Sequence, residues 1–241
     1  MMNPERMVYE IAVWLKEQMD LANAKGYVVG LSGGVDSAVA AALAVKGLGV
    51  DNVLGLIMPV ESDMVADGEK VAKSLHISWY THNLSLAYHQ FLDGVGRMSN
   101  RREITGNLKA RLRMCDLYYV ANIMNYLVLG TGNRSEIEMG YFTKYGDGGV
   151  DVLPLGGLYK DQVYRLARVL DIPQEVIDRP PSAGLWPGQT DEEEMGVTYE
   201  DIECFLSGAG DANTPEQNIK MGLMQKRSEH KRRMPPIWTG L

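Results

Sequence analysis

The residues best suited to chemistry form the glycine-rich run Gly30-Leu31-Ser32-Gly33-Gly34-Val35-Asp36-Ser37. A β-branched segment, 27–29, precedes this run and an alanine-rich segment, 38–45, follows it, so the pattern predicts a strand, a tight turn and a helix. Backbone N–H groups at such a turn, next to a helix N-terminus, form a binding site for anions. The hydroxyls of Ser32 and Ser37 add donors, and the Asp36 carboxylate can hold a magnesium ion. The run therefore indicates a site for a metal-bound nucleotide phosphate.

Two other interpretations of this turn stay open on the residues alone. The first five residues also satisfy G-x-S-x-G, the pattern of a nucleophile elbow, which would make Ser32 a nucleophile. That reading needs an acid and then a histidine further along the chain, and the one late histidine, His230, lies in a basic helical end. The glycines could also serve the backbone of a tight turn and nothing else. A Walker-type loop is excluded, because no Gly-Lys-Ser/Thr sequence occurs in the chain.

The elements that must position this turn alternate between strands and helices. Strands are predicted near 27–31, 53–58, 77–80 and 126–129, and helices near 4–22, 37–46, 65–75, 85–93 and 107–124. Two more helices are predicted near 159–170 and 215–231, and the polar, glycine-flanked segment 94–106 is expected to be a mobile loop. The alternation predicts an α/β fold, a Rossmann-like parallel sheet with helices on both faces. We expect one domain over residues 1–241.

Length, charge and cysteine content limit the classes of function. The chain has 241 residues and a net charge of -7, which argues against nucleic-acid binding by the surface as a whole. Its two cysteines match neither a disulfide framework nor a metal-binding pair, so a reducing cytoplasm fits. The N-terminal residues do not follow the pattern of a signal peptide. No apolar run approaches the roughly 20 residues that span a bilayer, so no membrane partner is expected.

Further motifs, in a fixed order, point to one family. The Ser-Gly-Gly-Val-Asp-Ser run resembles the pyrophosphate-binding loop of the ATP pyrophosphatases, which split ATP between its α and β phosphates and activate a substrate as an adenylate. Downstream lie Gly106-Asn107-Leu108-Lys109-Ala110-Arg111, Gly130-Thr131-Gly132-Asn133-Arg134-Ser135-Glu136, Phe142-Thr143-Lys144-Tyr145-Gly146-Asp147-Gly148, Pro181-Ser182-Ala183-Gly184 and His230-Lys231. This series resembles the NAD synthetases, which amidate deamido-NAD (nicotinic acid adenine dinucleotide). The resemblance covers the chain from about residue 10 nearly to its C-terminus.

The resemblance implies roles for individual residues. Residues 30–37 would hold the ATP phosphates, with Asp36 and Glu136 as magnesium ligands, and Lys160 would act with these two in catalysis. The other ATP contacts that it implies are Thr131, Lys160 and Ser182. It implies that deamido-NAD is bound by Arg111, Lys144, Asp151, His230 and Lys231. Members of the family are homodimers with the dinucleotide near the subunit interface.

The resemblance also implies the nitrogen source. Glutamine-using relatives carry an extra amidase domain with a nucleophilic cysteine, and this chain has no room for one. Ammonia, free or delivered by a separate protein, is therefore the expected substrate beside ATP and deamido-NAD. The run Gly132-Asn133-Arg134 departs from the family pattern, because many relatives have an aspartate after the turn that bears the threonine.

Simpler explanations exist for several of these residues taken singly. Thr131 could cap the helix that begins near Arg134. Asp36 could be a helix N-terminal charge, and as an exposed loop carboxylate it would contribute little to stability. Two other functions also remain, a sister adenylating enzyme such as a tRNA-modifying thiolase and a nucleotide-binding module without catalysis. A tRNA-binding enzyme would need a basic surface, which this acidic chain lacks.

Overall fold

A four-stranded parallel sheet forms the centre of the computed structural model, which describes residues 3–61, 65–182, 184–186, 188–209 and 213–239. The strands are β1 (Tyr27–Gly30), β2 (Val53–Ile57), β3 (Ser78–Thr81) and β4 (Leu127–Leu129), and they lie in the order β3-β2-β1-β4. In β1, Tyr27 pairs with Val53 of β2 on one side and with Leu127 of β4 on the other. The predicted Rossmann-like α/β fold is confirmed.

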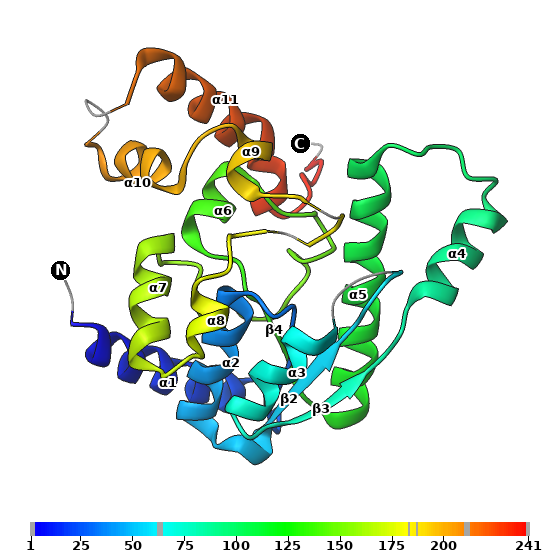
Figure 1. Cartoon of the computed structure of the whole chain (residues 1–241), viewed down its shortest axis with the longest axis vertical. Helices are drawn as coiled ribbons and strands as arrows, with labels where there is room; N and C mark the ends of the chain where they lie inside the picture. Colours follow the sequence, from blue (N-terminus) through cyan, green and yellow to red (C-terminus); the bar gives the residue numbers. More distant parts are fainter. Residues whose placement is uncertain (1–2, 62–64, 183, 187, 210–212, 240–241) are drawn as a thin grey trace.

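Helices cover both faces of this sheet (Figure 1). One face packs on α1 (Pro4–Leu21), α2 (Val35–Leu48), α3 (Val65–Ser74), α7 (Lys160–Val169) and α8 (Gln174–Ile177). The other face packs on α5 (Arg102–Met124), which is flanked by α4 (Ser85–Gly94). A short 3-10 turn (Val50–Asn52) precedes β2. Because helices cover both faces of the sheet, the side chains on both sides of its central strands are buried. This explains why the sequences of these strands are continuous apolar runs.

The alanine-rich helix α2 is buried along most of its length. Its alanines from Ala38 to Ala44 are between 0% and 3% exposed, because α1 and α7 both pack against it. At Gly47 a side chain would collide with the carbonyl oxygen of Ala12, so glycine permits the close approach of α1. This packing fixes the direction of α2, and hence the position of the turn at its N-terminus.

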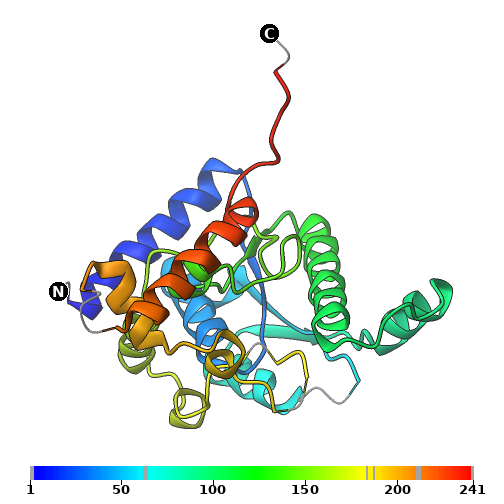
Figure 2. The same cartoon turned by 90° about the horizontal axis from the view of Figure 1, so that it is seen from above.

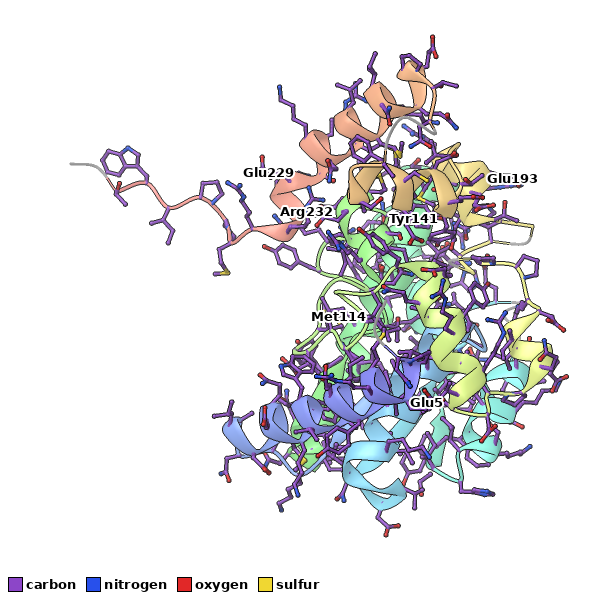
Figure 3. The ribbon with its side chains drawn as sticks, turned by 90° about the vertical axis from the view of Figure 1, so that its left-hand side faces the viewer. Glu5, Met114, Tyr141, Glu193, Glu229 and Arg232 are labelled. Carbon is purple, nitrogen blue, oxygen red and sulfur yellow. The ribbon has the colours of Figure 1, made fainter. Side chains whose placement is uncertain are left out.

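A second layer lies beyond the carboxyl ends of the strands (Figure 1). It consists of α6 (Arg134–Met139), α9 (Asp191–Met195), α10 (Tyr199–Ser207) and α11 (Pro215–Arg232). These helices share a small hydrophobic cluster of their own, made by Met139, Met195, Val197, Tyr199, Ile202 and Met221. Arg232, labelled in Figure 3, ties α11 to α6 by donating to the carbonyls of Ile137 (2.9 Å) and Glu138 (3.1 Å).

Two segments differ from the sequence-based expectations. Helix α5 begins at Arg102, so the predicted loop over 94–106 is too long by five residues; Gly106 is helical and packs closely against Leu185 and Trp186. Helix α8 was missed, because it is only four residues long and lies in a proline- and glycine-rich stretch. Within the described part of the chain, no helix combines the length and apolar character needed to cross a membrane.

Candidate active site

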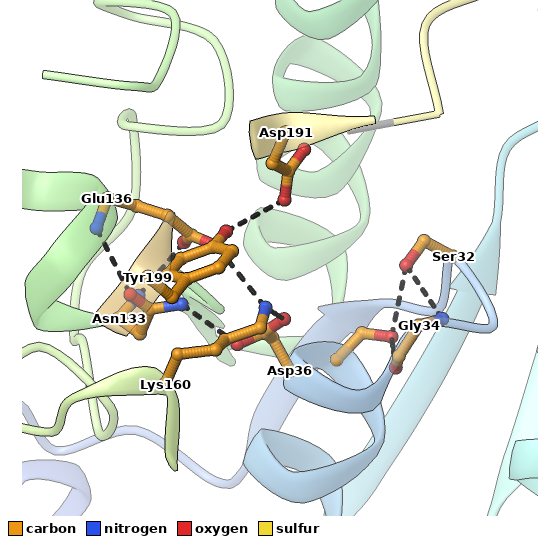
Figure 4. A network of polar contacts seen from close by, with 9 residues as sticks. Ser32, Gly34, Asp36, Asn133, Glu136, Lys160, Asp191 and Tyr199 are labelled. Atoms are coloured by element: carbon orange, nitrogen blue, oxygen red, sulfur yellow. Dashed lines mark hydrogen bonds and ion pairs between the residues drawn. The ribbon is translucent and has the colours of Figure 1, made fainter. Parts of the chain in front are cut away.

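The predicted phosphate turn joins the carboxyl end of β1 to the start of α2 (Figure 4). Gly33 has a φ of 80°, a left-handed conformation that favours glycine, and Gly34 is the N-cap of α2. Ser32 Oγ accepts from Gly34 N at 3.2 Å and lies 3.2 Å from Ser37 Oγ. The first turn of a helix leaves backbone N–H groups without intrahelical partners, so the turn can receive an anion.

Leu31 and Val35 contribute to this turn through their backbone alone. Their side chains are 3% and 4% exposed and belong to the main core. The N–H of Leu31 also donates to Leu56 O at 2.8 Å, as part of the contact between β1 and β2. The donors available to a phosphate therefore come from the later residues of the turn.

Asp36, one residue into α2, meets two residues from distant parts of the chain. Its Oδ2 lies 2.5 Å from Lys160 Nζ, and its Oδ1 accepts from Asn133 Nδ2 at 3.1 Å. Lys160 is the first residue of α7 and its side chain is 4% exposed; its ammonium is also 3.6 Å from Glu136 Oε1. The structure thus brings the three predicted catalytic residues together, with the carboxylates of Asp36 and Glu136 beside the ammonium of the buried Lys160. Asp36 is 20% exposed and paired, so the expectation of an exposed loop carboxylate is wrong.

Asn133 positions Glu136. It is fully buried, and it forms a reciprocal capping box at the start of α6: Glu136 N donates to Asn133 Oδ1 and Asn133 N donates to Glu136 Oε2, both at 3.1 Å. One asparagine therefore orients both predicted metal ligands. The alternative reading of Thr131 as the cap of this helix is wrong, because Asn133 has that role.

Tyr199 and Asp191 complete the cluster (Figure 4). The Tyr199 hydroxyl lies 2.8 Å from Asp191 Oδ2 and 3.2 Å from Glu136 Oε1, and its ring lies 5.0 Å from the Lys160 ammonium. Asp191 is 3% exposed, and its second oxygen, Oδ1, has no protein partner among the described residues. The sequence analysis missed both residues. The sequence offers one signal, the helix-start spacing of Thr190 with Glu193 and of Thr198 with Asp201. A helix start, however, does not show where its first side chain points.

Burial and mutual repulsion shift the protonation of these groups. Burial, and then the negative charge of Asp36, raise the pKa of Glu136 to about 8. Burial also raises the pKa of Asp191. Burial alone would lower the pKa of Lys160, but attraction by Asp36 and Glu136 outweighs this and raises it. Lys160 therefore stays charged at neutral pH, while Glu136 carries a proton for much of the time when no other cation is near.

The raised pKa of Glu136 gives a prediction for stability in a chelating buffer without magnesium. A carboxyl group whose pKa is about 8 when folded and ordinary when unfolded binds more protons in the folded state between pH 5 and 8. Its contribution to the free energy of unfolding should therefore fall as the pH rises through this window. Thermal or urea unfolding of wild type and Glu136→Gln checks this: the stability of wild type relative to the variant should decrease from pH 5 to 8. A constant difference would contradict it.

The donor set suits a magnesium ion. Asp36 Oδ2 and Glu136 Oε1 both lie near one cation, the Lys160 ammonium, and oxygen atoms are the ligands that magnesium prefers. No group of three or more acidic, histidine or cysteine side chains arranged to hold a metal is found in the described ranges. Two carboxylates are nevertheless usual for magnesium, which keeps water and substrate phosphate oxygens as its other ligands.

Four of the five predicted dinucleotide-binding residues lie together in a second cluster, where α11 ends beside the segment after α6. Lys144 Nζ donates to His230 O at 2.6 Å, and Arg111 donates to Lys144 O at 3.2 Å. Lys231 Nζ donates to the carbonyls of Gly140 and Phe142, both at 2.7 Å. Lys231 therefore holds the backbone of this segment. His230 is exposed, and its backbone carbonyl accepts the hydrogen bond from Lys144.

Within the described ranges, three predicted residues make no hydrogen bond to either cluster: Asp151, Ser182 and Thr131. Asp151 accepts from Val128 N at 2.7 Å and from the Tyr118 hydroxyl at 3.0 Å. It therefore provides a hydrogen-bond acceptor for a backbone N–H of β4, an edge strand of the sheet. Ser182 is exposed and accepts from Gly184 N at 3.1 Å in a local turn. Thr131 is half-buried between β4 and Asn133. The roles of these three in binding substrates stay predictions.

Comparison with known proteins shows to which family the chain belongs. A family model for NAD synthase matches residues 7–235. The chain belongs to the NAD synthase family. The ammonia-dependent NAD synthetase of Syntrophomonas wolfei is 45% identical over 245 residues, covering 98% of this chain and 96% of that protein. The predicted resemblance to ammonia-dependent NAD synthetases is confirmed, and with it membership of a family of C–N ligases of NAD biosynthesis.

Two solved structures share the whole fold. The NMN synthetase of Francisella tularensis superimposes with a TM-score of 0.92 at 41% identity and covers 99% of this chain and 100% of that one. The ammonia-dependent NAD synthetase of Campylobacter jejuni superimposes with a TM-score of 0.83 at 26% identity, with the same coverage. Both matches cover 99% of this chain, so they include the sheet and the second layer of α6, α9, α10 and α11.

Proposed function

We propose that this chain is an ammonia-dependent NAD synthetase that converts deamido-NAD, ATP and ammonia to NAD, AMP and pyrophosphate. The observation that carries the proposal is the buried contact of Lys160 with Asp36 and Glu136, directly beside the phosphate turn of α2. The 45% identical relative supports the choice of substrates by its name. The reading of Ser32 as a nucleophile has no support here, because its hydroxyl contacts Ser37 and Gly34 and no histidine.

The reaction joins two anions, so the site must neutralise charge. A nicotinate carboxylate oxygen attacks the α-phosphorus of ATP, the bond to the bridging oxygen breaks and pyrophosphate leaves with its electron pair. Ammonia then attacks the acyl carbon and loses a proton, and AMP leaves. A magnesium ion held by Asp36 and Glu136 would supply charge neutralisation for the phosphates. Among the chain's own residues, the helix N-terminus of α2 binds phosphate oxygens and the Lys160 ammonium stabilises the negative charge that develops.

Positioning accounts for the rest of the catalysis that we propose. Asn133 holds Asp36 and Glu136 in one arrangement, so little reorganisation is needed when charge develops. Residues 30–37, Thr131, Lys160 and Ser182 hold ATP, and Arg111, Lys144, Asp151, His230 and Lys231 hold deamido-NAD. Two nucleotides bound side by side react as if at high concentration, which can supply much of the rate.

The role of Lys144 gives a prediction about selectivity. Lys144→Ala removes the ammonium that we propose binds deamido-NAD and that donates to His230 O at the end of α11. We therefore expect the variant to weaken deamido-NAD binding more than ATP binding. Hydrogen bonds to charged groups are worth about 1.5–3 kcal/mol, which predicts about a 10-fold to 100-fold rise in the Kd of deamido-NAD. Calorimetric titrations with each substrate measure this. Lys226→Ala, which removes an exposed lysine of the same helix, is the control. Equal weakening of both substrates would refute the assignment.

We also propose a homodimer with the dinucleotide site near the interface. The outer side of α5 exposes Tyr119 (66%) and Ile123 (66%), and residues 233–239 run away from the body with Trp238 91% exposed (Figures 2 and 3). Exposed apolar side chains of this size favour contact with another protein surface. Sedimentation should show twice the mass of the chain.

The ammonia that we propose as the nitrogen substrate would come from solution or from a separate protein.

A second candidate substrate is favoured by one observation. The Francisella structure, with a TM-score of 0.92 and 41% identity, is named an NMN synthetase, whereas the Campylobacter NAD synthetase is 26% identical. An NMN synthetase would amidate the mononucleotide, which lacks the AMP half of deamido-NAD. Both substrates present the same carboxylate to the same ATP site, so the choice depends on residues that contact the AMP half.

One assay tests the function and decides between the two substrates. Purified protein receives ATP, magnesium and ammonium with either deamido-NAD or its mononucleotide counterpart, and amide product, AMP and pyrophosphate are followed. We expect ammonium-dependent NAD formation with one AMP and one pyrophosphate per turnover, and its loss when magnesium is chelated. A kcat/KM higher for the mononucleotide would favour NMN synthesis. No amidation of either substrate by folded protein would refute the proposed function.

A further inference from the structure

Lys109 is a buried lysine outside the cluster around Asp36. It lies on α5 with 9% of its side chain exposed; its ammonium is 3.0 Å from Glu61 Oε2 and donates to Leu185 O at 3.2 Å. The ammonium also lies 5.5 Å from the centre of the Tyr88 ring, a cation–π distance. Burying an ammonium is unfavourable unless it has partners, so these contacts explain how the fold tolerates this residue. They join α5 to two segments that are distant in the chain.

The first segment follows the carboxyl end of β2. Glu61 has a φ of 62°, a left-handed conformation that is uncommon outside glycine, and its N–H donates to Ser85 Oγ at 2.8 Å. The same segment is tied to α5 a second time, because Arg113 Nε donates to Met58 O at 3.1 Å. Strained residues of this kind persist where the surroundings hold them, and they concentrate at functional sites.

The second segment leads into α9 and the candidate active site. Leu185 and Trp186 pack on Gly106, where a Cβ atom would lie 3.1 Å from Leu185 Cδ1. Leu185 N donates to Gln189 Oε1 at 2.9 Å, and Gln189 Nε2 in turn donates to Glu194 Oε2 at 2.7 Å. Gln189 is 7% exposed and stands two residues before Asp191, the residue that contacts Tyr199. A continuous set of contacts therefore runs from the Lys109 ammonium to the start of α9.

We propose that Lys109 is a positioning residue for the reaction. Its ammonium fixes Leu185 and, through Gln189, holds Asp191 in the place where the Tyr199 hydroxyl reaches both Asp191 and Glu136. An apolar side chain of the same length would fill the same space on α5 but could not hold the Leu185 carbonyl. The inference rests on the proposed function, because it assigns Lys109 to the same site.

The variant Lys109→Met tests this by removing the charge while keeping the length of the side chain. We expect a folded protein whose kcat falls about 10-fold to 100-fold, the size of effect that a small misplacement of a site produces. We also expect faster amide hydrogen exchange in 188–196, with little change in 35–48. A purely structural lysine would lower the melting temperature without altering kcat or this exchange pattern, and that result would overturn the proposal.

Two further variants keep the test decisive. Lys73→Met removes a lysine with the same kinds of partner, a glutamate at 3.2 Å and an aromatic ring at 5.8 Å, but on the exposed surface of α3, and should leave kcat and exchange unchanged. Should Lys109→Met fail to fold, Glu61→Gln weakens the same contact and is expected to change kcat and exchange in the same direction. Unchanged kcat and exchange in folded Glu61→Gln would then overturn the proposal.

The exchange measurement separates this inference from the proposed function. If wild type amidates neither substrate, the proposed function fails, yet faster exchange in 188–196 of Lys109→Met would still show that Lys109 holds this segment. If wild type is active and Lys109→Met has normal kcat and normal exchange, the proposed function stands and the role of Lys109 is refuted.

Discussion

Replacing Asp36 with asparagine is expected to lower kcat at least about 100-fold, the size of effect seen when a group that stabilises transition-state charge is removed. The amide keeps the shape of the carboxylate but loses the charge that pairs with Lys160 at 2.5 Å and the ligand that we propose for magnesium. The measurement is steady-state kcat for pyrophosphate release at saturating substrates, with magnesium varied. We also expect the magnesium concentration at half-maximal rate to rise.

The structure changes the expected effect of this variant on stability. An exposed loop carboxylate would contribute little, but Asp36 is only 20% exposed and shares the buried Lys160 with Glu136. Loss of one charged hydrogen bond predicts a fall of about 2 kcal/mol in the free energy of unfolding. Asp116→Asn is the matched control, because Asp116 is 13% exposed and pairs with His82 at 2.9 Å, away from the cluster. Near-normal turnover in folded Asp36→Asn would refute its role in metal binding and catalysis.

The order of the elements could be predicted from the sequence because short apolar runs and amphipathic segments alternate along it. Periodicity reports which residues face a core, and the four strands and α1, α2 and α11 follow from it with small errors at their ends. Helix α5 was also predicted, but it begins five residues earlier than expected. It reports less well on short elements. Helix α8 has four residues and α9 has five, so neither contains enough turns to show a period.

The composition of the site could be predicted only in part, and for a physical reason. Asp36 and Lys160 are 124 residues apart, so no local spacing relates them; the resemblance to a family supplied the pair and the fold brings them together. Asn133 could have been found, because Asn-x-x-Glu before a short helix is the pattern of a capping box. Its second bond, to Asp36, could not, because it depends on how β1 and β4 lie side by side.

Asp191 and Tyr199 show the same limit more sharply. Both are the first residues of helices. The sequence does not show whether the side chain of such a residue points to solvent or into the protein. Packing of Met195, Val197 and Ile202 against Met139 turns both residues toward Glu136. The hydrophobic cluster beyond the sheet thus determines part of the polar site.

The largest combined effect on activity and stability is expected from Lys160→Met. The Lys160 side chain is 4% exposed and its ammonium contacts two carboxylates, so its loss leaves Asp36 and Glu136 close together without that cation. Removing one partner of a buried ion pair costs about 3–5 kcal/mol, and kcat should fall about 100-fold to 1,000-fold because the developing phosphate charge loses its protein cation. The pKa of Glu136, already raised to about 8, should rise further.

Magnesium distinguishes this explanation from a simple loss of packing. With Lys160 gone, a divalent cation becomes the means of neutralising Asp36 and Glu136, so magnesium should raise the melting temperature of Lys160→Met more than that of wild type. Differential scanning fluorimetry with and without magnesium measures the two shifts. Lys46→Met, which removes an exposed lysine near the end of α2, should behave as wild type in both assays. If Lys160→Met responds to magnesium no more than Lys46→Met does, the two carboxylates do not form the metal site, and the charge on Lys160 serves the fold alone.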